Sequence, residues 1–320
     1  MTIRALPSAR TLQPGLLAFT TNWKYSGGKR DLRLDLLRGF AALAMVVDHV
    51  GGEQSWLYWV TGGGKLWVSA AELFVLIAGL TMGIVYGAMA TKLGIGPAVK
   101  KALGRAWRMY LVMVALTFSF VALSIVLGLP WAPALTWATL PVWALQVATL
   151  QRTFFLVDIP FMYTVLIALA APVLLALWKG WTLPLLAASW ALWAIWQVAP
   201  GTVELPWRVA DNSMFHLAAW QVIFVHGVVV GFHREALLRV VRTSAFEVLL
   251  ASATVLAMVG AMWATEQHDG GLLQSGSFLL NQLYDKANVP FGRLVMLAVS
   301  FTFLYSLITV AWQPISGILS

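Results

Sequence analysis

A series of apolar segments, each about as long as a bilayer is thick, constrains the fold of this chain more than any other feature. A helix needs about 20 mostly apolar residues to cross the hydrocarbon core. Eight segments meet or approach this length, and they lie at residues 33–51, 68–90, 106–128, 159–178, 182–199, 215–232, 245–264 and 291–313. Only 11% of the residues are charged, whereas soluble domains carry about 25%. We therefore predict an all-α, polytopic helical membrane protein with the lipid bilayer as a partner.

A ninth apolar stretch, residues 135–150, is shorter and contains Pro141. Whether it crosses the membrane decides the sidedness of everything after it, and cytoplasmic loops are those that collect Lys and Arg. If the stretch does not cross, the basic residues of the N-terminus, of 92–108, of Lys179 and of 234–242 all fall on one side. If it crosses, the last cluster moves to the other side. We therefore predict eight spans, a short re-entrant or interfacial helix at 135–150, and both termini in the cytoplasm beneath a bacterial inner membrane.

The net charge and the absence of cysteine exclude several functions. The sequence has a formal net charge of +8 and contains no cysteine. In a membrane protein a surplus of Lys and Arg marks cytoplasmic loops rather than a nucleic-acid surface, and we expect no nucleic-acid partner. Without cysteine there is no disulfide, no thiol nucleophile and no thiolate metal site. We expect no metal ion and no permanently bound cofactor.

The chain is expected to have two parts. Residues 1–30 form a cytoplasmic, partly disordered N-terminal lead, whose only apolar patch, GLLAF, is too short for the core of a signal peptide. Residues 31–320 form a single transmembrane domain, whose first span acts as an uncleaved insertion signal. No convincing internal repeat is present, which gives no support to an inverted-repeat transporter.

The first span carries an unusual set of ionisable residues, because RGFAALAMVVDH at 38–49 begins with Arg38 and ends with Asp48 and His49. Eleven residues at about 100° each return to nearly the same helix face, about 16 Å along the axis. Asp35 lies one turn before Arg38, a spacing at which the two pair. Each charge costs about 2.5–3.5 kcal/mol at a helix centre and usually faces a cavity. We therefore predict a functional helix; the alternative is that the carboxylates sit at span ends and Arg38 reaches the headgroups.

The second span begins near the outer boundary with Glu72, at the depth at which His49 approaches the same boundary. A neighbouring carboxylate fixes the tautomer of a histidine and stabilises its protonated form. Glu72 is thus expected to orient His49. In the alternative interpretation Glu72 only lies at the start of a span and has no role in the site.

Four ordered segments then resemble one family. They are RDLRLDLLRGFAALAMVVDHV, AAELFVLIAGLTMGIVYG, FHLAAWQVIFVHGVVVGF at 215–232 and YDKANVPFGRLVML at 284–297. They resemble the OpgC family of integral-membrane proteins linked to succinylation of periplasmic glucans. That family is related to the membrane acyltransferase-3 group, whose Arg-x10-His pattern falls here on Arg38 and His49. The family usually has Asp where Ser69 stands and continues into further helices, whereas this sequence stops at Ser320.

The resemblance implies transfer of an acyl group from cytoplasmic acyl-CoA, as donor substrate, to a glycan hydroxyl on the other side. Arginine binds phosphate in a bidentate manner, and Arg38, Arg105 and Arg108 are expected to hold the phosphates of coenzyme A. His49 is the expected general base, with Glu72 or Asp48 orienting it.

Four further residues are predicted to meet the substrate: Trp220, Gln221, His226 and Lys286. Trp220 resembles a family position, and Lys286 lies on the outer side, where an anionic group would meet it. The alternatives are a helix–helix hydrogen bond for His226 and an ordinary loop charge for Lys286.

Two other functions compete with the acyltransferase. A proton- or ion-coupled transporter also needs ionisable residues inside the membrane. A catalytically inactive acyltransferase-like protein would bind a lipid or partner without turnover.

Overall fold

The computed structural model describes residues 23–25, 30–61, 67–154, 157–204, 207–269 and 284–319. Over these ranges the protein is helical, and its β-structure is limited to an isolated bridge between Arg152 and Ala210. The prediction of an all-α protein is confirmed. Most of the predicted N-terminal lead lies outside the described residues.

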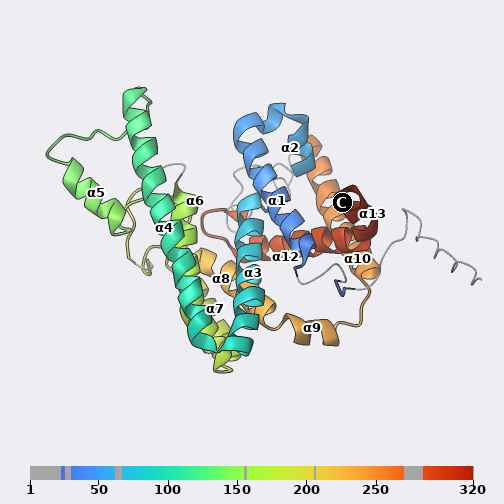
Figure 1. Ribbon diagram of the computed structural model, residues 1–320. Helices are drawn as coiled ribbons and strands as arrows, with labels where there is room; N and C mark the ends of the chain where they lie inside the picture. The colour runs from blue at the N-terminus through green and yellow to red at the C-terminus, as the bar shows by residue number, and fades with distance from the viewer. Residues whose placement is uncertain are drawn as a thin grey trace, which may run out of the picture.

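The described helices are labelled in chain order (Figure 1). They are α1 (Leu32–Val46), the π-helical η1 (Val47–Gly51), the 3-10 turn η2 (Gly52–Gln54), α2 (Trp56–Thr61), α3 (Ala70–Leu93), α4 (Ile95–Val126), α5 (Leu140–Ala148), α6 (Asp158–Trp178), α7 (Thr182–Val198), α8 (Leu217–Phe232), α9 (Arg234–Val240), α10 (Ala245–Asp269), α12 (Phe291–Val310) and α13 (Trp312–Leu319).

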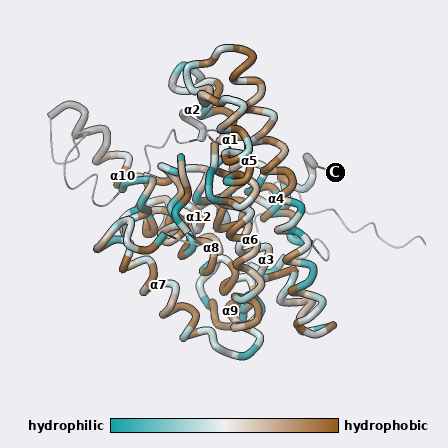
Figure 2. Tube along the Cα trace, turned by 90° about the vertical axis from the view of Figure 1, so that its left-hand side faces the viewer, coloured by the Kyte–Doolittle hydropathy of each residue, from teal (hydrophilic) through white to brown (hydrophobic). Residues whose placement is uncertain are grey.

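The predicted count of eight spans is not confirmed. Among the described residues five helices, α3, α4, α6, α10 and α12, are long and apolar enough to cross a membrane, and a sixth is the pair α8 and α9 if it counts as one span bent by 73°. The α1 and α7 helices have 15 and 17 residues, short of the roughly 20 that a perpendicular span needs. Each of the eight predicted segments nevertheless contains one helix, and apolar residues recur along α4, α6 and α7 (Figure 2).

The ninth segment forms only the nine-residue helix α5, with Pro141 in its first turn. Proline is tolerated there because the first N–H groups of a helix have no partner inside it. At 1.5 Å per residue α5 is about 14 Å long, too short to cross the core. It lies beside the end of α4 (Figure 1), as expected of a helix that does not cross.

Helices α3 and α8 pack closely through glycine. A Cβ atom added to Gly79 or Gly83 would collide with the backbone of α8, and one added to Gly227 or Gly231 would collide with the backbone of α3. Small residues allow such contact, and close packing is what holds helices together in lipid. This pair forms the centre against which the other elements are placed.

The connections divide between the two ends of the bundle. The α3–α4 and α6–α7 turns and helix α9 lie at one end, whereas η1, α2 and α5 lie at the other (Figure 1). The first end carries the basic residues Lys92, Lys100, Lys179 and Arg234. This grouping is the one expected if that end faces the cytoplasm.

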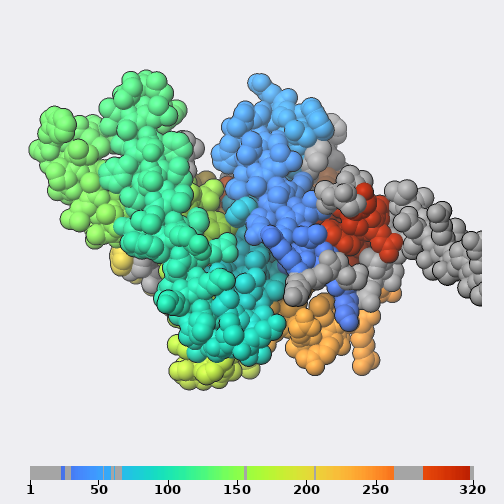
Figure 3. Space-filling model, viewed as in Figure 1, coloured from blue at the N-terminus to red at the C-terminus, as the bar shows by residue number. Residues whose placement is uncertain are grey.

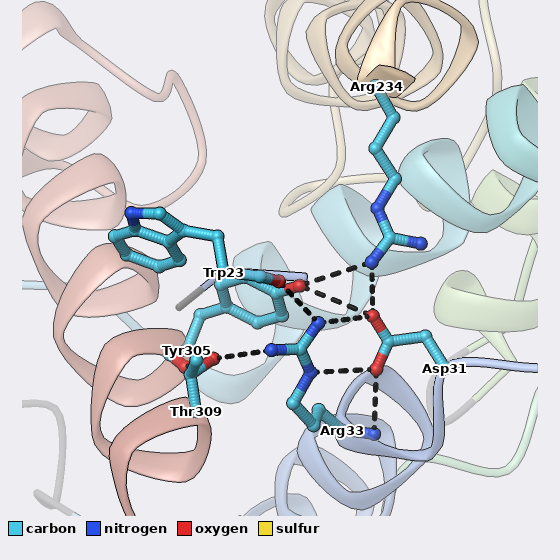
Figure 4. A network of polar contacts seen from close by, with 6 residues as sticks. All are labelled: Trp23, Asp31, Arg33, Arg234, Tyr305 and Thr309. Carbon is cyan, nitrogen blue, oxygen red and sulfur yellow. Dashed lines mark hydrogen bonds and ion pairs between the residues drawn. The ribbon is translucent and has the colours of Figure 1, made fainter. Parts of the chain in front are cut away.

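A buried polar network fastens the start of α1 at that basic end (Figure 4). Asp31 accepts hydrogen bonds from the backbone N–H of Arg33 at 3.1 Å, from its Nε at 2.9 Å and from Arg234. Arg33 also donates to Oγ1 of Thr309 at 3.0 Å and to the carbonyl of Trp23 at 3.1 Å. Three distant parts of the chain, α1, α9 and α12, are thereby joined.

The same network sets the charge state of Asp31. Burial raises the pKa of this carboxyl, but the hydrogen bonds and charges of Arg33 and Arg234 outweigh burial and hold the pKa below its usual value. Asp31 is therefore ionised and fully paired.

Candidate functional site

His49 lies in η1, the π-helical turn that follows α1. Its Nδ1 is 2.7 Å from the carbonyl oxygen of Met45, and its side chain is exposed. A carbonyl only accepts, so Nδ1 donates the hydrogen bond and, in the neutral ring, Nε2 keeps its lone pair. π-Helical turns are rare in proteins, but those that occur often lie at functional sites. This local geometry therefore favours a proton-accepting role for His49.

The π-helical turn also alters the predicted geometry of the first span. The face shared by Arg38 and His49 was calculated for a regular helix, but the turn is wider from Val47 onward. Asp48, next to the histidine, accepts a hydrogen bond from Oγ1 of Thr61 at 3.1 Å, which ties η1 to α2. The side chain of Asp48 is thus hydrogen-bonded to α2.

Glu72 forms a buried ion pair with Arg293 of α12. Both residues are buried, at 0% and 6% exposure. Glu72 also accepts from the backbone N–H of Ser69 at 3.0 Å, as part of a capping box at the start of α3, and Arg293 donates to the carbonyl of Tyr284 at 2.9 Å. The described contacts of Glu72 are therefore with Arg293 and Ser69, and no hydrogen bond to His49 is among them.

Arg293 was missed by the sequence analysis, although the signal was present. The residue lies near the start of an apolar segment, and intramembrane arginines need a carboxylate or carbonyl partner. The sequence supplied the arginine but not the pairing, because 221 residues separate it from Glu72.

The segment that precedes α12, residues 284–290, is held by tryptophans. It includes Lys286, which is half-buried. The indole N–H groups donate to its backbone and to Asn288, from Trp193 to the carbonyl of Val289 at 2.9 Å, from Trp196 to Oδ1 of Asn288 at 2.9 Å and from Trp220 to the carbonyl of Ala287 at 3.2 Å. Trp220 is fully buried. Its described contact fixes this segment, and a contact with substrate stays a prediction.

Asp158 is the first residue of α6. Its side chain accepts a hydrogen bond from the backbone N–H of Ile159 at 3.0 Å, and the charges of Lys286 and His49 are within electrostatic range of it. Asp158 was not singled out from the sequence, although an acidic residue at the start of an apolar segment was a signal for it.

A second group of polar residues lies between α1, α4 and α6. Arg38 pairs with Asp35, as their spacing predicted, and Asp35 also pairs with Arg30 at 2.5 Å. The charge of Arg105 acts on Arg38, and the charges of both arginines act on Tyr163. The hydroxyl of Tyr163 is buried and has no hydrogen-bond partner among the described residues. Two cations beside a hydroxyl of this kind are suited to an anionic ligand.

The remaining predicted residues are distributed differently. Arg108 is exposed on α4. His226 accepts from the indole of Trp190 at 3.1 Å, which is the helix–helix bond of the alternative interpretation. Gln221 is bonded to Ser189 of α7 at 2.7 Å. The predicted roles of these three residues toward substrate are not tested by these contacts.

The helix ends that carry these groups leave open space between them. Figure 3 shows a hollow in the surface, with α4 on one side and α1, η1 and α2 on the other.

Comparison with known proteins gives one match. No curated protein and no solved structure matches the chain. The family model described as OpgC protein matches residues 30–319, nearly the whole chain and the full helical domain. The match covers α1 with its Arg38–His49 pattern, the α3–α8 pair and the segment before α12, and the chain therefore belongs to the OpgC protein family.

Proposed function

We propose that the protein is a membrane-embedded O-acyltransferase of a bacterial inner membrane. It moves an acyl group, such as succinyl, from cytoplasmic acyl-CoA to a hydroxyl of a glycan on the other side. The observation that carries the proposal is the exposed His49, whose Nδ1 donates to the carbonyl of Met45 and thereby leaves Nε2 as the proton acceptor of the neutral ring. Membership of the OpgC family supports the same reaction class.

The donor would bind through the group formed by Arg38, Arg105 and Tyr163. Guanidinium groups make strong, charge-assisted hydrogen bonds to phosphate. The hydroxyl of Tyr163, which has no hydrogen-bond partner among the described residues, would donate another. The Cα atoms of Arg38 and His49 would be about 16 Å apart on a regular helix. A long pantetheine arm along α1 would therefore carry the thioester from the arginines toward the histidine.

The reaction needs one base and a good leaving group. Nε2 of His49 takes the proton of the acceptor hydroxyl as its oxygen attacks the thioester carbonyl, and the carbon–sulfur bond then breaks. The coenzyme A thiolate leaves, and the imidazolium returns the proton to that sulfur. The carboxylate of Asp158 stabilises the imidazolium through its charge.

A direct assay tests this proposal against both alternatives. Purified protein in lipid discs is incubated with labelled succinyl-, acetyl- or longer-chain CoA and a gluco-oligosaccharide. Label on the sugar that is lost in His49→Ala supports the enzyme. Donor binding without turnover would indicate an inactive binding protein, and no donor binding would favour the transporter.

A matched control is His233→Ala. His233 lies at the opposite end of the bundle and contacts Thr182 at 2.9 Å. We expect this variant to transfer the label at the normal rate.

A further inference from the structure

A large basin opens at the same end of the bundle as His49. It has a volume of about 790 Å³ and lies among the loops that follow α4 and α5 and the loop that precedes α8. This volume lies within the roughly 300–1,000 Å³ usual for ligand sites. The side chains that line it include Trp131, Trp207, Arg152, Asp211, Asp158 and His216.

The walls of the basin are fastened to each other. The backbone N–H of Thr153 donates to Ala210 at 3.1 Å, and that of Ala210 donates to Gln151 at 2.9 Å. Arg152 pairs with Asp211 across the same bridge and also donates from Nε to Gln146 of α5 at 2.8 Å. The loops thus form a defined cavity rather than an accidental gap.

Two tryptophans present their rings at this cavity. Trp131 and Trp207 line it and are 47% and 45% exposed. The indole N–H of Trp207 donates to the carbonyl of Leu150 at 2.9 Å, so the ring is held in place and its polar atom is satisfied. Such a ring offers a rigid apolar surface surrounded by polar groups.

The charges of the lining are mixed. Three carboxylates, of Asp158, Glu204 and Asp211, lie in the same wall as the cations Arg152 and Arg208 and the imidazole of His216. A wall of this balance does not favour a strongly charged ligand, and its polar groups do not favour a lipid tail. Ring surfaces flanked by many hydrogen-bonding groups suit a neutral, polyhydroxylated ligand, whose C–H faces stack on indole while its hydroxyls bond to the polar groups.

Asp158, the first residue of α6, lines the basin. The basin adjoins α5, which lies at the same end of the bundle as η1, the turn that carries His49 (Figure 1). We propose that this basin is the acceptor site and that it binds a neutral oligosaccharide on Trp131 and Trp207. This inference rests on the proposed function and specifies where and how its acceptor binds.

The test is calorimetric titration of the purified protein in lipid discs with neutral gluco-oligosaccharides of increasing length, without any acyl-CoA. We expect binding that strengthens with length, because a longer sugar reaches both rings. In Trp131→Ala and Trp207→Ala the affinity should fall by about tenfold. Trp131→Phe should restore part of the loss in the first case, because an aromatic ring remains.

The control is Trp137→Ala. Trp137 lies in the same loop as Trp131 and is 91% exposed, but the basin is lined by Trp131 instead. Unchanged affinity in this variant, with reduced affinity in the two others, supports the site. A melting curve for each variant separates lost binding from lost folding.

The outcomes also separate this inference from the proposed function. Sugar binding that persists in His49→Ala and needs both rings supports the basin even if no acyl transfer is detected. Absence of sugar binding, equal binding in the ring variants, or tighter binding of inorganic phosphate than of sugar overturns the basin, even if transfer from acyl-CoA is measured.

Discussion

The two ends of α1 differ in how completely their charges are paired. At its start, Asp31 is bonded to Arg33 and Arg234 and both partners reach further groups. Beyond its end, His49 is exposed and bonded to a backbone carbonyl through one nitrogen only. An ionisable group whose partners are all inside the protein contributes to folding. An exposed imidazole with one nitrogen not hydrogen-bonded to the described residues is available for proton transfer. The same contrast separates Glu72, which forms a buried ion pair with Arg293, from Asp158, whose side chain accepts, among the described residues, a hydrogen bond from the backbone N–H of Ile159.

The comparison predicts its largest effect at His49. Replacement by Ala removes the proposed general base, and acyl transfer should fall by about 10²–10⁴-fold. Because the side chain is exposed, the free energy of unfolding should change by only about 0.5 kcal/mol. Transfer assays and denaturant unfolding measure the two quantities. Normal transfer by this variant would place the base elsewhere.

The opposite result is expected for Glu72 and Arg293. Removing one partner of a buried ion pair typically lowers the free energy of unfolding by about 3–5 kcal/mol. Glu72→Ala and Arg293→Ala should each show such a loss, and the double replacement by Met should recover much of it, because no unpaired charge is left. Denaturant unfolding in lipid discs measures the free energy of unfolding of each variant. A Glu72→Gln variant that unfolds normally but transfers no acyl group would return Glu72 to the catalytic role predicted from the sequence.

An intermediate effect is expected at the arginines near Tyr163. Loss of Arg38 or Arg105 removes a charge-assisted contact worth about 1.5–3 kcal/mol, or about ten- to a hundred-fold in donor affinity. Replacement by Lys keeps the charge but not the planar fork, so rescue should be partial.

Titration with a non-hydrolysable CoA thioester checks these values beside a thermal melt. The melt matters for Arg38, because it also pairs with Asp35, and its loss would lower stability if that pair is its main role. Arg108→Ala should have a smaller effect, since Arg108 is exposed and Arg105 is the arginine that acts on Arg38. A donor affinity equal to that of the wild type in all three arginine variants would mean that the donor binds elsewhere.

A smaller loss than at Glu72, about 1–3 kcal/mol, is expected for Asp31→Asn, because the amide keeps part of the hydrogen bonding and Arg33 also donates to Thr309 and Trp23. The pKa of Asp31 is lower in the folded protein than its usual value. Its stabilising contribution is therefore fully present above the unfolded pKa of about 3.9 and is lost as pH falls toward the folded pKa.

Melting curves of the wild type and Asp31→Asn should therefore differ at neutral pH and converge in acid. A difference that persists unchanged below that range would show that the ionised state of Asp31 is not what stabilises the network.

How far the sequence predicts this protein differs between helices and contacts. Apolar length and the placement of Lys and Arg are local properties, so they predicted a helix within every expected segment, the short α5 and the grouping of basic turns at one end. They did not predict helix length closely, because the first span ends its regular helix at Val46 and continues as a π-helical turn. A change of hydrogen-bond register of this kind leaves no mark in the hydropathy pattern.

What the sequence by itself determined is the all-helical class, the family and the residues with unusual charge, among them Arg38 and His49. Only the tertiary structure decided the partners of those residues. In the structure Glu72 pairs with Arg293 rather than with His49, and the indole of Trp220 donates to the backbone carbonyl of Ala287. The reason is physical: a charge inside the membrane must find a partner, but the packing of helices far apart in the chain selects which one.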